Sequence, residues 1–320
     1  MISVGTNSTR VLLADVAPEV PRVGLARTIG TRIGEGLGES GRLGEEPMRR
    51  TLDAIGALQR SVRGHYVRLF GIATSALRRA ENGDEFLGRA RDLLGVSMRV
   101  LSGDEEARAS YRGGIAALGA LRGERVGVVD AGGGSTEYAL GTSTTPERAL
   151  SCEIGAVRLT EEVPALAGRD GVVEPAAIER ARAVAREALA PLRECDAVER
   201  VAFAGGTATT TAAIVRARKG TIDAYPLTRA NLQEVLMRLC ATGLEERKTM
   251  VGMMVQRADI LPGGIIVLDA ALDLVNLDAA VATTSDLLMG YLLQQRDAAG
   301  SPAGVRPPRR AGPQTQRGLQ

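Results

Sequence analysis

The 320-residue sequence has few of the side chains on which several protein classes depend. Its three cysteines, Cys152, Cys195 and Cys240, show no C-x-x-C spacing, which argues against a zinc site and against a disulfide framework. Its one histidine, His65, has no partner histidine for metal binding or proton relay, and we interpret it as structural. Free thiols of this kind fit a reducing compartment, so we expect a cytoplasmic protein.

Long apolar runs and an excess of one charge are also missing. No run of about 18 apolar residues occurs, and the N-terminus has no basic region followed by an apolar one, so neither a membrane span nor a signal peptide is expected. Forty basic residues against 38 acidic ones give a net charge of +2, which provides no bulk attraction to nucleic acid. Lys219 and Lys248 are the only lysines. The many arginines suit phosphate binding, although a genome-wide codon bias explains them more simply.

The most informative stretch is VGVVDAGGGSTEYAL, residues 126–140. A β-branched run predicts a strand, and Gly132, Gly133 and Gly134 predict a tight turn with positive φ that approaches a ligand closely. The N–H groups of such a turn form an anion site, so phosphate is the expected guest. Asp130 beside a phosphate indicates a divalent cation between them, with Glu137 as a second carboxylate. The alternative is a plain hairpin with a solvent-facing acid.

A second copy of this turn near the start of the chain favours the phosphate site. With an offset of 127, ISVGTNSTRVLL at residues 2–13 places Gly5 under Gly132 and Ser8 under Ser135, with apolar strands on both sides. Two related turns suggest a duplicated domain that clamps one ligand.

Strand and helix patterns alternate along the rest of the chain, which predicts an α/β fold. A third strand–glycine–helix start falls at Gly205 and Gly206, where backbone N–H groups could face an anion. The length suits two domains, which we expect at residues 1–123 and 124–296, followed by a disordered, proline-containing tail at 297–320. The strands are expected at 2–16 (a hairpin), 23–29, 67–73, 98–101, 126–129, 137–141, 147–153, 200–204 and 281–285, and the helices at 47–62, 85–94, 102–121, 175–192, 231–240, 245–254 and 258–274, with a last helix ending at 293.

Eight blocks of the sequence, in order, resemble the exopolyphosphatase/guanosine pentaphosphate phosphatase (Ppx/GppA) family, in its short form without the C-terminal histidine–aspartate (HD-type) domain. The blocks are GTNSTRVLLADV, GIATSALRRAENGDEFL, VLSGDEEAR, VVDAGGGSTEYALG, GAVRLTE, AGGTATT, RADILPGGIIVL and TTSDLLMGYLL. The resemblance implies two similar actin-like ATPase/sugar-kinase (ribonuclease H-like) domains flanking a central cleft. It also implies a homodimer that hydrolyses a terminal phosphoanhydride by in-line attack of water.

The resemblance assigns roles to individual residues. Matching SGDEEA to the family motif makes Glu106 the catalytic base. For Glu105 we keep the alternative interpretation, a solvent-exposed residue at a helix N-terminus with no catalytic role. Asp130 and Glu137 match the carboxylates for Mg²⁺ or Mn²⁺, and Arg78 resembles the arginine that receives substrate phosphate across the cleft. The loop residues expected to contact phosphate are Thr6, Asn7, Ser8, Gly132, Gly133, Gly134, Ser135, Gly206 and Thr207.

One position departs from the family pattern. Ser3 stands where an Asp usually precedes the first glycine loop, and the internal alignment places it opposite Asp130. Three explanations are open: the replacement weakens metal affinity, it leaves metal binding to Asp130 and Glu137, or it reflects a misplaced start of the chain.

Short inorganic polyphosphate is the expected substrate. One histidine in the whole sequence excludes the HD-type domain, whose surface could grip long chains or a nucleotide, and eight aromatic residues offer few surfaces on which guanine could stack. The alternatives are hydrolysis of guanosine pentaphosphate (pppGpp) by the same residues and a non-catalytic protein that binds polyphosphate or alarmone, which the serine at position 3 would suit. The Glu106 block disfavours a third alternative, an ATP-dependent kinase of the same superfamily.

Overall fold

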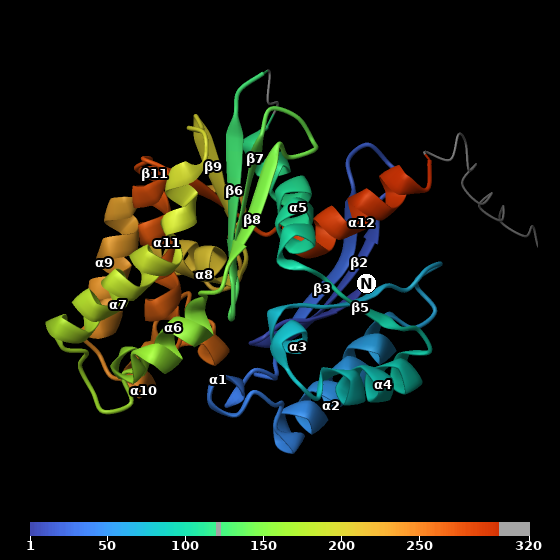
Figure 1. The fold of residues 1–320 in the computed structure, drawn as a ribbon, viewed down its shortest axis with the longest axis horizontal. Coiled ribbons are helices and arrows are strands. Elements are labelled where there is room, and N and C mark those ends of the chain that lie inside the picture. Colours follow the sequence, from blue (N-terminus) through green and yellow to red (C-terminus); the bar gives the residue numbers. More distant parts are fainter. Residues whose placement is uncertain (120–122, 301–320) are drawn as a thin grey trace, which may run out of the picture.

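The structure is a computed structural model that describes residues 1–119 and 123–300, and it contains two mixed β-sheets with helices packed against them (Figure 1). The last helix, α12 (Leu287–Ala298), continues past the predicted end at residue 293. The remainder of the predicted tail, from residue 301, lies outside the described residues, as do residues 120–122.

The first sheet has the strand order β3-β2-β1-β4-β5. Its apolar face is covered by α2 and α4, whose buried side chains form one cluster with those of the strands. We call this sheet and helices α1 to α4 the first lobe. Its elements are β1 (Ile2–Val4), β2 (Ser8–Asp15), β3 (Arg22–Gly30), α1 (Leu37–Ser40), α2 (Glu45–Val62), β4 (Gly71–Ala73), α3 (Ser75–Arg79), α4 (Gly83–Leu94) and β5 (Met98–Val100).

The second sheet has the strand order β10-β11-β9-β6-β7-β8 and shares one core with α6 to α9 and α11, which lie together with α10 on the left of Figure 1. We call it, with these helices, the second lobe. The short edge strand β10 was not predicted from the sequence. The elements are β6 (Val126–Ala131), β7 (Thr136–Gly141), β8 (Arg148–Cys152), α6 (Ala156–Glu162), α7 (Pro175–Ala188), β9 (Arg200–Ala204), α8 (Gly206–Val215), β10 (Tyr225–Thr228), α9 (Arg229–Cys240), α10 (Leu244–Thr249), α11 (Leu261–Leu274) and β11 (Ala279–Thr283).

The two lobes repeat one topology. Apart from β10, the order β8-β7-β6-β9-β11 matches β3-β2-β1-β4-β5, with the same sequence of antiparallel and parallel pairings. Val4 pairs with Thr9 and Ala131 with Thr136, so the register also repeats at the offset of 127. The duplication inferred from one short alignment is therefore confirmed, as are the α/β class and the two similar domains.

Two helices exchange partners between the lobes. Helix α5 (Gly103–Gly114) follows the first sheet but buries its apolar side chains against β6, β7 and β9 of the second. Helix α12 ends the second lobe but packs against β2 and β4 of the first. The two helices cross between the lobes (Figure 1), and Gly290 brings their backbones so close that a Cβ there would lie 1.7 Å from the carbonyl oxygen of Ala109.

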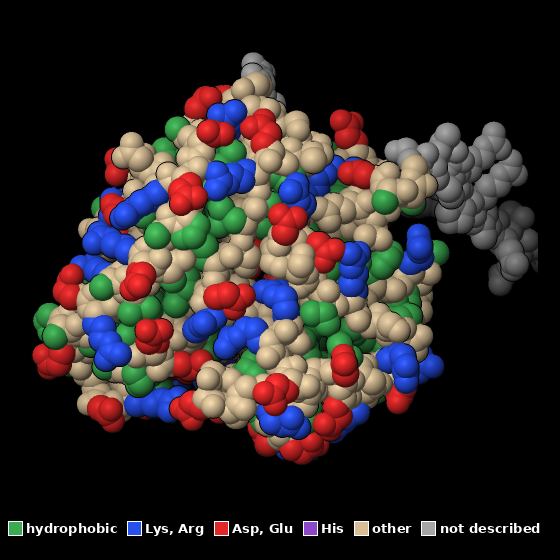
Figure 2. Space-filling view, in the orientation of Figure 1, with side chains coloured by type: hydrophobic (Ala, Val, Ile, Leu, Met, Phe, Trp, Pro, Cys, Tyr) green, Lys and Arg blue, Asp and Glu red, His purple; other side chains and the backbone are tan. Residues whose placement is uncertain are grey.

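Charged side chains of both signs are interspersed over the face seen in Figure 2. In the described part of the chain, no helix has the length and apolar character needed to cross a membrane.

Candidate active site

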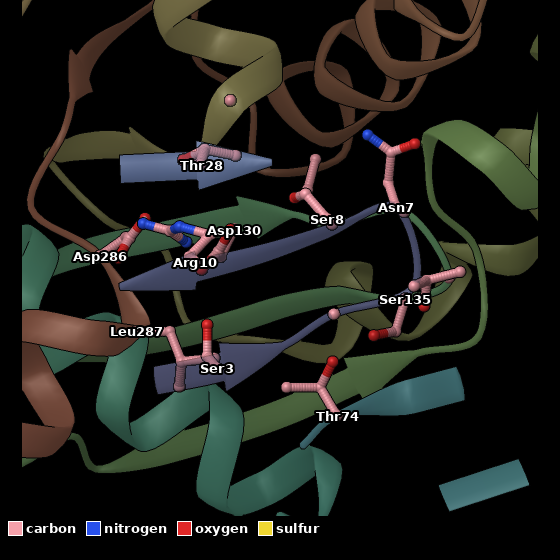
Figure 3. A pocket seen from close by; sticks show the side chains of 18 of the residues that line it. Ser3, Asn7, Ser8, Arg10, Thr28, Thr74, Asp130, Ser135, Asp286 and Leu287 are labelled. Atoms are coloured by element: carbon pink, nitrogen blue, oxygen red, sulfur yellow. The ribbon is translucent and has the colours of Figure 1, made fainter. Parts of the chain in front are cut away.

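The duplicated turns meet at a cavity of about 270 Å³ between the lobes (Figure 3). Of the residues singled out in the sequence, Arg78 and Thr207 do not line it. The predicted residues that do line it are Thr6, Asn7, Ser8, Glu106, Asp130, Gly132, Gly133, Gly134, Ser135, Glu137 and Gly206.

The turns at Gly5–Ser8 and Gly132–Ser135 have the same local structure. In each, the N–H of the first residue donates to the carbonyl of the fourth at 3.0 Å. The expectation of positive φ in the second turn was wrong, since none of its glycines has one. These glycines allow close approach instead, because a Cβ on Gly134 would lie 2.7 Å from Oγ1 of Thr6 and one on Gly133 would lie 3.2 Å from Cβ of Thr6. The Thr6 side chain of the first turn therefore packs directly on the glycine backbone of the second.

The backbone of the turns leaves its donors available. The carbonyls of Gly132 and Gly133 accept hydrogen bonds from the first N–H groups of α6. Within residues 1–119 and 123–300, the N–H groups of Thr6, Asn7, Gly133 and Gly134 have no acceptor. Buried polar groups are nearly always paired, so such a set of free donors points to an anionic ligand.

Buried side chains around the cavity are also without partners. Both amide atoms of Asn7, Oγ of Ser75 and Nε of Arg257 are buried and make no hydrogen bond in the described part of the protein. Each leaves a desolvation penalty that a bound ligand would remove.

The third glycine turn joins the cavity through Gly205 and Gly206 at the start of α8. Gly205 has a φ of +91°, and a Cβ on it would lie 2.8 Å from Oδ1 of Asp130, so a side chain there would be strained and crowded. A Cβ on Gly206 would lie 2.1 Å from Nη2 of Arg257. The Arg257 guanidinium thus packs directly on the turn backbone, and burial together with the nearby Arg10 lowers its pKa to about 10.

Asp130 and Glu137 are direct cross-strand neighbours on β6 and β7, so both point to one face of the sheet. Ser110 donates to Oδ2 of Asp130 at 2.6 Å, and Ser151 donates to Oε1 of Glu137 at 2.8 Å. Burial and then the charge of Asp286 raise the pKa of Asp130 to about 6. Burial, followed by the neighbouring carboxylates, raises the pKa of Glu137 well above its usual value. Burial and the neighbouring charges therefore disfavour the ionised forms of both carboxyl groups.

Glu106 reaches the cavity from the first turn of α5. Ser102 and Glu105 form a capping box at the start of this helix, which fixes the direction of the following residue. The Glu106 carboxylate is buried and forms an ion pair with Arg78, which also donates to the carbonyl of Leu101 at 2.8 Å. Burial raises the pKa of Glu106 to about 7, although Arg78 opposes the rise.

Three charged lining residues, Arg10, Arg257 and Asp286, were missed in the sequence. Arg10 donates to Asp286 at 2.5 Å, and both lie beside Asp130 in Figure 3. The repeat offset could have identified Arg10, because it pairs with Ser3 as Glu137 pairs with Asp130. The first turn therefore carries a hydroxyl and a cation where the second carries two carboxylates.

The donor set fits a divalent cation bound together with phosphate. The described residues contain no cluster of three or more His, Cys, Asp or Glu side chains that could hold a metal ion alone. Mg²⁺ typically takes one or two carboxylates and fills its other positions with phosphate oxygens and water. Asp130 and Glu137 match this pattern, and a cation would stabilise the ionised forms that burial and nearby carboxylates disfavour.

The fold and the site define a two-lobed α/β protein whose duplicated turns enclose an anion-binding cavity with carboxylates at its edge. Residues 15–292 match the Ppx/GppA phosphatase family, and the chain belongs to that family of hydrolases.

Relatives and solved structures agree with this assignment. The chain is 33% identical to exopolyphosphatase 2 of Mycobacterium tuberculosis over 313 residues, which cover 91% of this chain and 96% of that protein. It is 28% identical to the guanosine-5'-triphosphate,3'-diphosphate pyrophosphatase of Aeromonas salmonicida, over 92% of this chain and 60% of that protein. A crystal structure of the Aquifex aeolicus Ppx/GppA family member matches with a TM-score of 0.76 at 25% identity, over 93% of this chain and 97% of the other.

Proposed function

We propose that this protein is an exopolyphosphatase that releases terminal orthophosphate from short inorganic polyphosphate. The observation that carries the proposal is the cavity itself, where two touching turns present free N–H groups next to three buried or partly buried carboxylates. The free N–H groups can bind the phosphate chain. Two of the carboxylates, Asp130 and Glu137, can bind a cation, and the third, Glu106, can act as a base. The 33% identity with an exopolyphosphatase supports this substrate class.

In the proposed reaction, Glu106 accepts a proton from water as the water oxygen bonds to the terminal phosphorus and the bridging P–O bond breaks. A pKa near 7 suits a group that must take up a proton at neutral pH. Arg78 holds the Glu106 carboxylate, and we propose that it also receives substrate phosphate as the chain enters. Asp130 and Glu137 would hold Mg²⁺ or Mn²⁺, which neutralises charge on the phosphates.

The turns would hold the phosphate chain itself. The phosphate-binding residues that we propose are Thr6, Asn7, Ser8, Gly132, Gly133, Gly134, Ser135 and Gly206, and Thr207 is buried next to Gly206 in the third turn. Arg10 and Arg257 add two cations that the sequence did not reveal.

Hydrolysis of pppGpp is the second candidate, since a relative with that type of activity in its name is 28% identical over 92% of this chain. The same residues would act, so the two candidates differ only in where the nucleoside binds. No aromatic side chain lines the cavity among the described residues, which favours polyphosphate over a guanine that needs a stacking surface.

Phosphate release from tripolyphosphate and from pppGpp, by wild type and by Glu106→Gln with Mg²⁺, tests the proposal. Glu105→Gln is the matched control, because it changes the adjacent carboxylate and retains a residue that suits the capping box. We expect wild type and the control to hydrolyse tripolyphosphate faster than pppGpp, and Glu106→Gln to bind both without turnover. Binding without turnover by wild type would make this a binding protein, and faster release from pppGpp would favour the second candidate.

We also propose that the protein is a cytoplasmic homodimer, as the family resemblance implies. Sedimentation of the purified chain tests the oligomeric state.

A further inference from the structure

A salt bridge between the lobes lies beside the cavity and has no role in the reaction proposed above. Arg32, which follows β3, donates through both terminal nitrogens to the two carboxylate oxygens of Asp259, each at 2.7 Å. One of these nitrogens also lies 3.3 Å from the carbonyl oxygen of Gln256. Asp259 is 6% exposed. A bidentate pair of this kind fixes the orientation of both partners and not only their distance.

The backbone around Arg32 holds the first phosphate turn. The N–H groups of Thr31 and Arg32 donate to the carbonyl of Asn7 at 3.0 and 2.9 Å, and the N–H of Gly34 donates to the carbonyl of Thr6 at 3.1 Å. Arg32 adopts a φ of 48°, in the left-handed region that residues other than glycine rarely occupy. Such a conformation persists only when contacts on several sides impose it, and here the backbone and the side chain both do so.

The Arg32 side chain binds Gln256 and Asp259, and Arg257 lies between these two residues. This arginine ends the short 3₁₀ turn Val255–Arg257, directly between Gln256 and Asp259 in the chain. Its guanidinium faces the cavity, and no carboxylate in the described residues lies within ion-pair distance of it. Its position is therefore set by its packing on Gly206 and by the backbone of its segment, which Arg32 holds on both sides of it.

We propose that Arg32 and Asp259 are positioning residues that set the first phosphate turn and Arg257 at the spacing required to grip one phosphate chain from both lobes. This inference rests on the proposed function, in which the turn and Arg257 bind phosphate. Arg32 acts through Arg257, so removing either residue should weaken phosphate binding, and removing both should weaken it no further than removing Arg257 alone.

A double-mutant cycle on tripolyphosphate affinity tests the inference. Calorimetry with Mg²⁺ would compare wild type, Arg32→Ala, Arg257→Ala and the double variant. We expect Arg257→Ala to raise Kd about 30-fold or more, Arg32→Ala to raise it about 10-fold, and the double variant to match Arg257→Ala. Arg32→Lys should behave like Arg32→Ala, because lysine keeps the charge but not the paired donors. Asp259→Asn should do the same.

The control is Arg229→Ala, which removes an ion pair with Asp269 inside the second lobe. It should lower the Tm and leave the Kd unchanged, as would any purely structural loss. Additive effects in the cycle, or an Arg32→Ala variant that loses stability but binds tripolyphosphate normally, would overturn the inference. In that case wild type would still release phosphate from tripolyphosphate. Failure of the proposed role of Arg32 and Asp259 can therefore be told apart from failure of the exopolyphosphatase proposal. A wild type that does not bind tripolyphosphate would overturn both.

Discussion

Replacing Asp130 by Asn should stabilise the metal-free protein while weakening its response to Mg²⁺. The Asp130 carboxylate is crowded by burial and by the charge of Asp286, and both disfavour its ionised form. An amide has nearly the same shape and can still accept the hydrogen bond from Ser110. The substitution therefore removes an unfavourable charge and preserves the local packing.

The pKa of Asp130 gives the size of the effect. A rise from 3.8 to about 6 corresponds to about 3 kcal/mol at pH 8, where the folded and unfolded carboxyl groups are both ionised. Water in the cavity screens part of this charge, so we expect a gain of about 1–3 kcal/mol, or roughly 2–6 °C in Tm. Because the folded-state pKa is the higher one, the penalty grows as pH rises from 4 to 6 and disappears below pH 4.

Thermal unfolding in chelator, measured between pH 4 and pH 8, checks this prediction. The difference in Tm between Asp130→Asn and wild type should be largest at pH 8 and smallest at pH 4. Mg²⁺ with tripolyphosphate should raise the Tm of wild type more than that of the variant. Asp269→Asn is the control, since it breaks the pair with Arg229 and should lower the Tm. A lower Tm for Asp130→Asn at pH 8, or a difference independent of pH, would refute the reasoning.

Three further predictions concern activity and packing. If Glu106 is the base, kcat/KM for phosphate release should fall about tenfold per pH unit below an apparent pKa near 7, and a flat profile down to pH 5 would contradict this role. Gly290→Ala should force α5 and α12 apart, because its Cβ would meet the carbonyl of Ala109, and should lower the Tm by several degrees. Gly88→Ala, with open space around its Cβ, should not lower it. Ser3→Asp should raise apparent Mg²⁺ affinity, and an unchanged or weaker metal titration would count against it.

Much of the architecture could be predicted from local patterns in the sequence. The offset of 127 between the glycine turns reflects a real duplication, because short repeated strands and turns carry their own signals of pairing and register. Strand β10 escaped detection because its four residues, including Pro226, have little periodicity of their own.

The site was only partly predictable, because its remaining members come from distant segments. Arg257 and Asp286 lie in recognised family blocks, but only the folded chain shows that they face Asp130 across the cavity. The glycines of the second turn were expected to supply positive φ angles. They are required for a different reason, because side chains there would collide with Thr6 and Asn7 of the first turn. Contacts between lobes leave no local trace in sequence.

The exchange of α5 and α12 also bears on how the chain reaches its native state. A fragment ending at residue 119 would carry α5 without the sheet that buries it, and its own sheet would lack α12. A fragment starting at residue 123 would have the reverse defect. Neither half should fold alone, so we expect a single cooperative unfolding transition and recovery of structure only when both fragments are mixed. During synthesis, the first sheet stays open on one face until the last helix leaves the ribosome.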